Sequence, residues 1–212
     1  MFKLQIKYLS FFFGIVSILS FFNIVYSYYF NLYLNLDTYY FTLGISFILF
    51  ITFFKFGKYN IKSNIFQKIL TIFLGYLLIP LVLSIPFYLS IYNLSFSNSF
   101  FEAISGFTST GFTVFENIKL IDQSLIIWRS STQWIGGLYF LFSIIYLIDI
   151  YDDSFKKTLT NFISFNSSEI LKQAAKIFIL YSSLTILIFT VLNIFSIRTF
   201  DSLNLALTII SS

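Results

Sequence analysis

Five long apolar runs, separated by short polar segments, constrain the fold of this chain more than any other feature of its sequence. They cover residues 8–30, 39–54, 69–92, 125–148 and 170–197. A hydrocarbon core about 30 Å thick takes roughly 20 apolar helical residues to cross, and a chain inside it must satisfy its own backbone hydrogen bonds. Of the 212 residues, 58% are hydrophobic and 10% are charged. The sequence therefore predicts an all-α polytopic membrane protein with five transmembrane helices.

Three of these runs contain further features that predict how each of them lies in the membrane. The first is too long for a signal-peptide core and lacks a small-residue cleavage site, so we expect it to remain in the mature protein. The second is short, but Tyr39 and Tyr40 are suited to anchor it at the membrane interface. The third contains Pro80 and Pro86, and a proline inside a helix removes a hydrogen bond and bends the axis. We therefore expect a kinked third helix.

The placement of the basic residues predicts the orientation in the membrane. Ten of the 13 basic residues lie in the amino terminus and in the segments after the second and fourth runs: Lys3, Lys7, Lys55, Lys58, Lys62, Lys68, Lys156, Lys157, Lys172 and Lys176. Loops rich in lysine and arginine stay on the cytoplasmic side. The amino terminus is therefore expected in the cytoplasm, and the polar segment between the third and fourth runs is expected to enter from outside.

The chain contains no Cys and no His, which excludes disulfides, thiolate chemistry and histidine-based metal or acid–base sites. No phosphate-binding glycine loop, zinc spacing or nucleophile with a base occurs in it. Asp149, Asp152 and Asp153 could form a divalent-metal site, but the neighbouring Lys156 and Lys157 favour a solvated loop. We expect the protein to be no enzyme, to carry no cofactor and to bind no nucleic acid.

The polar segment at residues 97–113 is the candidate functional element. Ser99 and Glu102 form a capping-box pattern, which predicts a short helix that ends near Gly106. Non-helical backbone follows, and at membrane depth such backbone must be buried in protein or line a water-filled cavity. Its carbonyls can then replace the water around a cation, and the carboxyl end of the helix adds partial negative charge. The alternative is an ordinary loop between two helices.

Two motifs in this order resemble the Trk/Ktr potassium-uptake family, membrane subunit, in its amino-terminal portion. They are FFEAISGFTSTG at residues 100–111 and WRSSTQWIGG at residues 128–137. The resemblance implies a helix, pore-loop and helix repeat that occurs four times per polypeptide, with four filter strands around one potassium path. It also implies a homodimer in the bacterial inner membrane, with a cytoplasmic nucleotide-binding regulatory subunit as partner.

The same resemblance implies which residues bind the ion. Potassium, as substrate, would be held by the backbone of Thr108, Ser109, Thr110 and Gly111, with Phe112 completing the strand. A serine at the filter glycine goes with sodium selectivity in plant relatives, so Gly111 favours potassium.

Other residues are candidates for supporting this segment. Glu102 and Arg129 either pair and hold the pore helix against the fourth span, or both reach water at the outer surface. Gly136 and Gly137 are expected to allow close helix packing, since small residues let backbones approach in membranes. The family usually has a further glycine where Tyr139 stands here, which leaves the tightness of that contact open.

A shift of 103 residues brings Ala103 onto Ala206 and Thr108 onto Ser211, which indicates the start of a second repeat. The predicted organisation is a helix pair at residues 1–67, a first repeat at 68–149 and a second repeat at 150–212 that stops in its pore helix. The predicted function is potassium uptake through a carbonyl-lined filter by an incomplete, amino-terminal part of a transporter. The alternative is a non-transporting remnant, or a scaffold half that needs a separately encoded second half.

Overall fold

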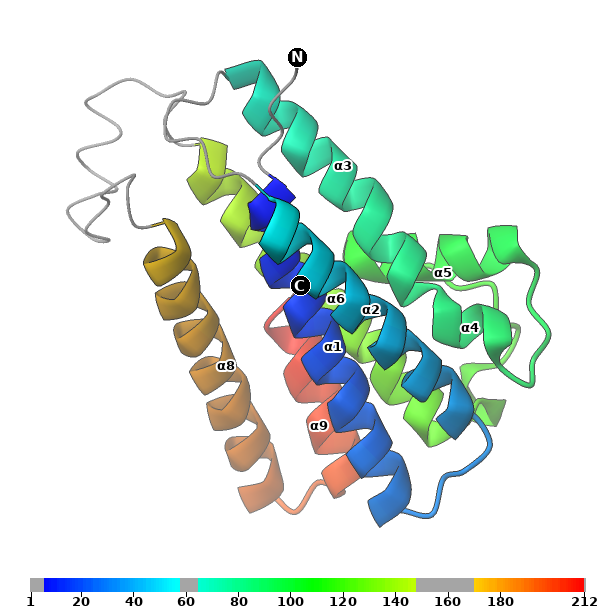
Figure 1. The fold of residues 1–212 in the computed structure, drawn as a ribbon. Helices are drawn as coiled ribbons and strands as arrows, with labels where there is room; N and C mark the ends of the chain where they lie inside the picture. Colours follow the sequence, from blue (N-terminus) through cyan, green and yellow to red (C-terminus); the bar gives the residue numbers. More distant parts are fainter. Residues whose placement is uncertain (1–5, 58–64, 148–169, 212) are drawn as a thin grey trace.

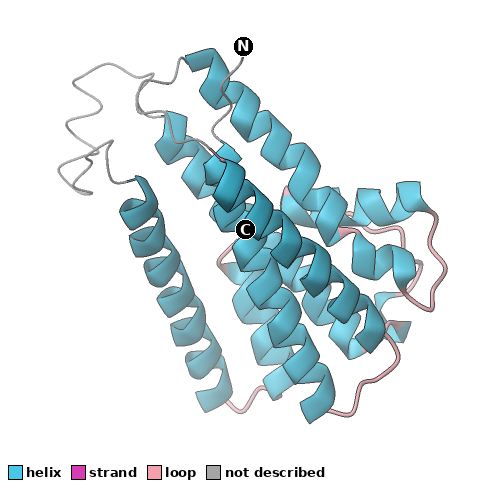
Figure 2. Ribbon diagram, viewed as in Figure 1, coloured by secondary structure: helices cyan, strands magenta, loops and turns pink. Residues whose placement is uncertain are grey.

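The structure, a computed structural model, describes residues 6–57, 65–147 and 170–211. This part of the chain is helical and contains no strand (Figures 1 and 2). The helices are α1 Ile6–Tyr29, α2 Leu36–Phe56, α3 Ile65–Leu83, α4 Ile85–Leu89, α5 Phe96–Phe107, α6 Gln123–Leu147, α8 Ile170–Ile194 and α9 Thr199–Ile209, with a 3₁₀ turn at Ile118–Leu120. The aspartates at 149, 152 and 153 lie outside the described residues.

Four of the five predicted runs coincide with one long helix each, and the third coincides with α3 and α4 together. Four of these helical segments are long and apolar enough to cross a membrane: Lys7–Tyr29, Leu36–Phe56, Ile65–Leu89 and Ala175–Ile194. Helix α6 is as long as α8 but more polar, because Ser130, Ser131 and Thr132 interrupt its apolar sequence. All three are buried and donate their hydroxyl groups to carbonyls of α6 itself. That α6 spans the bilayer as a fifth transmembrane helix stays a prediction.

The third run is interrupted where its prolines predicted a bend. Helix α3 ends at Leu83 and α4 starts at Ile85, with Pro86 in its first turn. Backbone carbonyls at this break accept hydrogen bonds from neighbouring groups, as a proline in a membrane helix requires. The amide of Ser84 donates to the carbonyl of Pro80 (2.8 Å), and the buried indole nitrogen of Trp128 on α6 donates to the carbonyl of Leu83 (3.0 Å). The break is therefore held in place by α6.

Helix α6 lies at the centre of the fold and packs against α1, α5 and α9 (Figure 1). Aromatic rings join it to α1: the rings of Phe12 and Tyr139 are 4.7 Å apart, and those of Tyr8 and Tyr146 are 4.8 Å apart. Helices α1 and α2 form a close pair, and α8 stands at the edge with many exposed apolar side chains. Apolar side chains on the outside suit a protein that is surrounded by lipid.

Tyr139, which stands where the resemblance leads us to expect a glycine, is accommodated by a glycine on another helix. A Cβ atom added to Gly75 of α3 would lie 1.8 Å from the Tyr139 hydroxyl oxygen. That hydroxyl donates to the carbonyl of Ile72 at 2.8 Å. The contact between α3 and α6 is therefore close, with the glycine and the larger residue on opposite sides.

Candidate ion-binding strand

Helix α5, the predicted pore helix, begins earlier than its sequence pattern predicted. Its N-cap is Ser95, whose hydroxyl oxygen accepts a hydrogen bond from the amide of Asn98 at 3.2 Å. The predicted capping box of Ser99 and Glu102 is wrong, because Ser99 is buried inside the helix and donates to the carbonyl of Ser95. Glu102 is thereby free to bind outside the helix. Ser95 carries the same N-capping chemistry one turn earlier, so pattern alone did not separate the two serines.

Residues 108–113 leave the helix as non-helical backbone, called the filter strand below although it pairs with no other strand in the described residues. Its first amides donate hydrogen bonds back to α5. The amides of Thr108, Ser109 and Thr110 donate to carbonyls in the last turn of the helix, at 2.8, 2.9 and 3.0 Å. Ser109 and Gly111 have positive φ angles of 54° and 79°. A Cβ at Gly111 would meet nothing within 4 Å, so glycine is favoured there by its backbone conformation rather than by lack of space.

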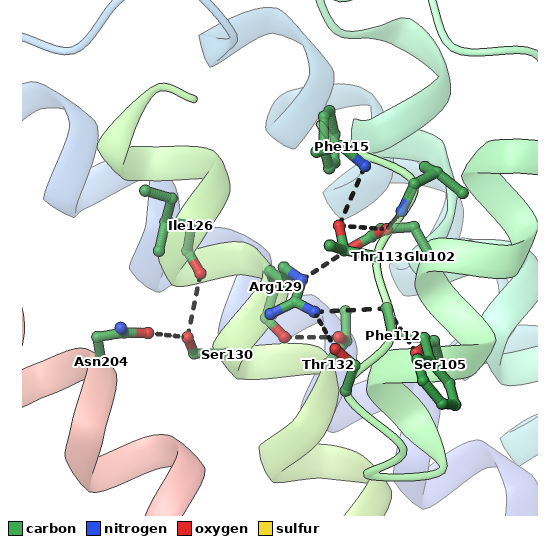
Figure 3. A network of polar contacts seen from close by, with 12 residues as sticks. Glu102, Ser105, Phe112, Thr113, Phe115, Ile126, Arg129, Ser130, Thr132 and Asn204 are labelled. Atoms are coloured by element: carbon green, nitrogen blue, oxygen red, sulfur yellow. Dashed lines mark hydrogen bonds and ion pairs between the residues drawn. The ribbon is translucent and has the colours of Figure 1, made fainter. Parts of the chain in front are cut away.

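Glu102 is the buried centre of a polar network beside this strand (Figure 3). Its carboxylate accepts hydrogen bonds from Nε of Arg129 at 2.6 Å, from the hydroxyl of Thr113 at 3.0 Å and from the amide of Val114 at 3.0 Å. The Glu102 side chain is 0% exposed and that of Arg129 is 16% exposed. Of the two alternatives left open by the sequence, the structure shows the ion pair, which joins α5 to α6.

Arg129 also contacts the strand itself (Figure 3). Its Nη2 donates to the carbonyl of Gly111 at 3.0 Å and lies 3.5 Å from the carbonyl oxygen of Phe112. The hydroxyl of Ser105 donates to the same Phe112 carbonyl at 2.7 Å. Two of the five carbonyls predicted to line the ion path therefore accept hydrogen bonds from the protein. The contact between Arg129 and Gly111 was not predicted from the sequence, because the two residues are 18 positions apart.

The start of the strand lines a cavity of about 390 Å³. The residues around it come from the third run, the pore segment, α6 and the turn that follows α9: Tyr76, Phe107, Thr108, Ser109, Gly136, Gly137, Phe140 and Ser211. A Cβ on Gly136 would lie 1.9 Å from the carbonyl oxygen of Phe107, so α6 touches the end of α5 directly. The carboxyl ends of the two short helices α5 and α9 thus lie at this cavity, and the helix dipole favours a cation at such ends.

Helix α9 repeats α5 at the shift predicted from the sequence. The two helices begin at Phe96 and Thr199, which are 103 residues apart. Ser99 and Ala103 of α5 are fully buried, and so are Ser202 and Ala206, their counterparts on α9. After the helices, the hydroxyl of Ser109 donates to the carbonyl of Ser211 at 3.0 Å. The structure therefore brings the ends of the two helices together, although they are distant in sequence.

No Asp or Glu of the described part of the chain lines the cavity. Among the described residues, no group of three or more Asp or Glu side chains is placed to hold a metal ion. The polar residues that line the cavity are Tyr76, Thr108, Ser109 and Ser211, and the Thr108 hydroxyl lies 2.6 Å from the hydroxyl of Thr110. Neutral oxygens of this kind replace the hydration shell of a monovalent cation.

Comparison with known proteins finds transporters. The chain is 30% identical over 149 residues to an uncharacterized cation transporter of Methanocaldococcus jannaschii, covering 66% of this chain and 30% of that protein. It is 29% identical over 106 residues to the Trk system potassium uptake protein TrkG of Escherichia coli, covering 46% of this chain and 22% of TrkG. A match to TrkI of Halomonas elongata, also a Trk system potassium uptake protein, is 38% identical over 60 residues, which are 28% of this chain and 11% of TrkI. No protein-family model matches the chain.

Among solved structures, the fold matches the crystal structure of the potassium transporter TrkH from Vibrio parahaemolyticus. The TM-score is 0.75, with 16% sequence identity, and the match covers 98% of this chain and 42% of that one. At this identity the match shows a shared fold. The chain spans less than half the length of each of these proteins.

Proposed function

Because this chain is a relative of the Trk potassium-uptake proteins over part of their length, we propose that it contributes one complete filter strand to a potassium-uptake pathway. The ion would be bound by the backbone of Thr108–Gly111, with Phe112 at the end of the strand. The observation that carries the proposal is the cavity, because residues 108 and 109 line it together with Ser211 of the repeated element. Carbonyl and hydroxyl oxygens, rather than side-chain charge, would select the ion.

The proposed transporter needs more polypeptide than this chain. A filter surrounds its ion, whereas the described residues supply one strand beyond α5 and the first residues beyond α9. The matched proteins are more than twice as long as the matched segments. We propose that the remaining strands come from a continuation of this chain or from a separately encoded polypeptide. A homodimer in the bacterial inner membrane, with a cytoplasmic nucleotide-binding regulator, is part of the same proposal.

Rubidium uptake tests the proposal. The genomic region that encodes this chain, with its neighbouring sequence, is expressed in cells that lack their own potassium uptake, beside the 212-residue chain alone. Uptake of labelled rubidium, competed by potassium and much less by sodium, is expected from the complete region and not from the chain alone. The variant Gly111→Ser is expected to lower the preference for potassium over sodium, as the resemblance implies.

Two results would go against the proposal. If the complete region yields a membrane-inserted protein but no cation uptake, the non-transporting alternative holds. If uptake occurs and Gly111→Ser, Gly111→Ala and the unchanged protein share one potassium-to-sodium ratio, the strand at 108–112 is not the filter. Protein amount in the membrane is measured in every case, so that absence of protein is not mistaken for absence of transport.

A further inference from the structure

We propose that Arg129 is a positioning residue for ion selectivity, acting as a tethered cation that holds the outer carbonyls of the filter strand. This inference rests on the proposed function. Its basis is that one guanidinium group binds the buried carboxylate of Glu102 and the carbonyl of Gly111, with the Phe112 carbonyl also in reach (Figure 3). A pair that only fixed α5 to α6 would not need the contacts to the strand.

The guanidinium is held in a single orientation. It is planar, so the positions of its Nε and Nη2 atoms are linked. Nε is 2.6 Å from Glu102, whose carboxylate is fully buried and receives two more bonds from Thr113 and Val114. Because Glu102 is fixed on three sides, Nη2 is directed at the Gly111 carbonyl, 3.0 Å away.

This arrangement affects which oxygens an ion can use. A carbonyl that accepts a charge-assisted hydrogen bond is oriented toward its donor, and the guanidinium charge repels a second cation nearby. The carbonyl of Phe112 is further occupied by the Ser105 hydroxyl. Within the proposed binding segment Thr108–Gly111, the ion would therefore be coordinated mainly by the carbonyls of Thr108–Thr110, because those of Gly111 and Phe112 already accept hydrogen bonds from the protein.

Loss of Arg129 would change the chemistry of the site in a definite direction. The Gly111 carbonyl would lose its donor, and the Glu102 carboxylate would be left buried with an uncompensated charge. Such a cluster of oxygens attracts small or divalent cations, which gain more than potassium from a charged ligand. Selectivity for potassium over sodium is therefore expected to fall, and block by divalent cations is expected to rise.

Two variants distinguish a role of Arg129 in positioning the filter strand from a role only in holding α5 against α6. In the charge exchange Glu102→Arg/Arg129→Glu, the ion pair between α5 and α6 can form again, but residue 129 no longer donates to Gly111. In Arg129→Lys the charge remains, but a single ammonium lacks the fork that reaches Glu102 and Gly111 together. The matched control is Arg198→Lys, because Arg198 also pairs with a carboxylate, Asp201 at 2.8 Å, but lies exposed at the start of α9.

The experiment measures potassium and sodium uptake ratios of the complete transporter that contains this chain. If Arg129 positions the strand, Arg129→Lys and the charge exchange both lose about tenfold in the ratio, the equivalent of one charge-assisted hydrogen bond. Arg198→Lys keeps the ratio of the unchanged protein. Because the ratio is read only from protein that transports, a loss of folding lowers both rates and leaves it unaffected.

Either of two results would overturn the inference. A charge exchange that transports with the unchanged ratio shows that pairing alone matters and overturns the inference, and so does an unchanged ratio in Arg129→Lys. If the charge exchange does not reach the membrane, Arg129→Lys alone decides. If the unchanged protein transports no cation, it is the proposed function that fails, and the two failures are thereby distinguished.

Discussion

Replacing Gly136 with alanine is expected to prevent the pore segment from reaching its folded position. The added Cβ would lie 1.9 Å from the carbonyl oxygen of Phe107 and 2.5 Å from its carbonyl carbon, so the clash is with backbone. Relief would have to move the end of α5, from which residues 108–112 follow. Overpacking of a well-packed contact costs about 1–3 kcal/mol, and a backbone clash of this size should exceed that range.

Gly44→Ala is the matched control, since a Cβ at Gly44 of α2 would meet nothing within 4 Å. Alanine favours a helix over glycine by about 1 kcal/mol, so this variant should be as stable as the unchanged protein or more stable. The unfolding temperatures of the purified proteins in detergent are compared, with size-exclusion chromatography after heating as the readout of folded protein. Equal unfolding temperatures for Gly136→Ala and Gly44→Ala would contradict the close contact between α5 and α6.

Replacing Glu102 with alanine is expected to destabilise the protein by about 3–5 kcal/mol, as removal of one partner from a buried ion pair does. Arg129 would lose the carboxylate with which it pairs, and the amide of Val114 and the hydroxyl of Thr113 would lose their hydrogen-bond acceptor. Denaturant unfolding of the purified chain in detergent would show the loss as a lower midpoint. The segment from Thr113 to Val114 should also exchange its amide hydrogens faster.

Asp201→Ala provides the comparison, because the pair between Asp201 and Arg198 is exposed and such pairs contribute little. Its midpoint should stay close to that of the unchanged protein. Glu102→Ala and Arg129→Ala combined should cost less than the sum of the two single changes, since the second removes a charge that the first left unpaired. A midpoint for Glu102→Ala as high as that for Asp201→Ala would show that the buried network does not stabilise the fold.

Much of the fold could be predicted because membrane helices depend on local composition. All five apolar runs became helices within a few residues of their predicted ends, and the third run broke beside Pro80 and Pro86. The shift of 103 residues also predicted where α9 would begin relative to α5. Hydrophobic length and internal repetition are properties of the sequence itself, which explains why these features could be seen there.

The contacts of the site were less accessible from sequence. The start of α5 was misplaced because Ser95 and Ser99 both suit an N-cap, and only packing decides which one is buried. The bond from Arg129 to the Gly111 carbonyl joins residues 18 apart and depends on how α6 passes the strand. Likewise, nothing in the sequence linked Gly75 to Tyr139 across two helices. These are tertiary contacts, which no local pattern encodes.

Locating a bound ion tests most directly whether residues 108–112 line a potassium path. Thallium(I) substitutes for potassium and can be located by its anomalous scattering in crystals of the assembled transporter that contains this chain. A thallium peak is expected within coordination distance of the carbonyls of Thr108–Thr110, displaced by potassium and not by an equal concentration of sodium. A thallium peak elsewhere in the protein with none on this strand, or one that sodium displaces equally, would contradict a potassium-selective filter at these residues.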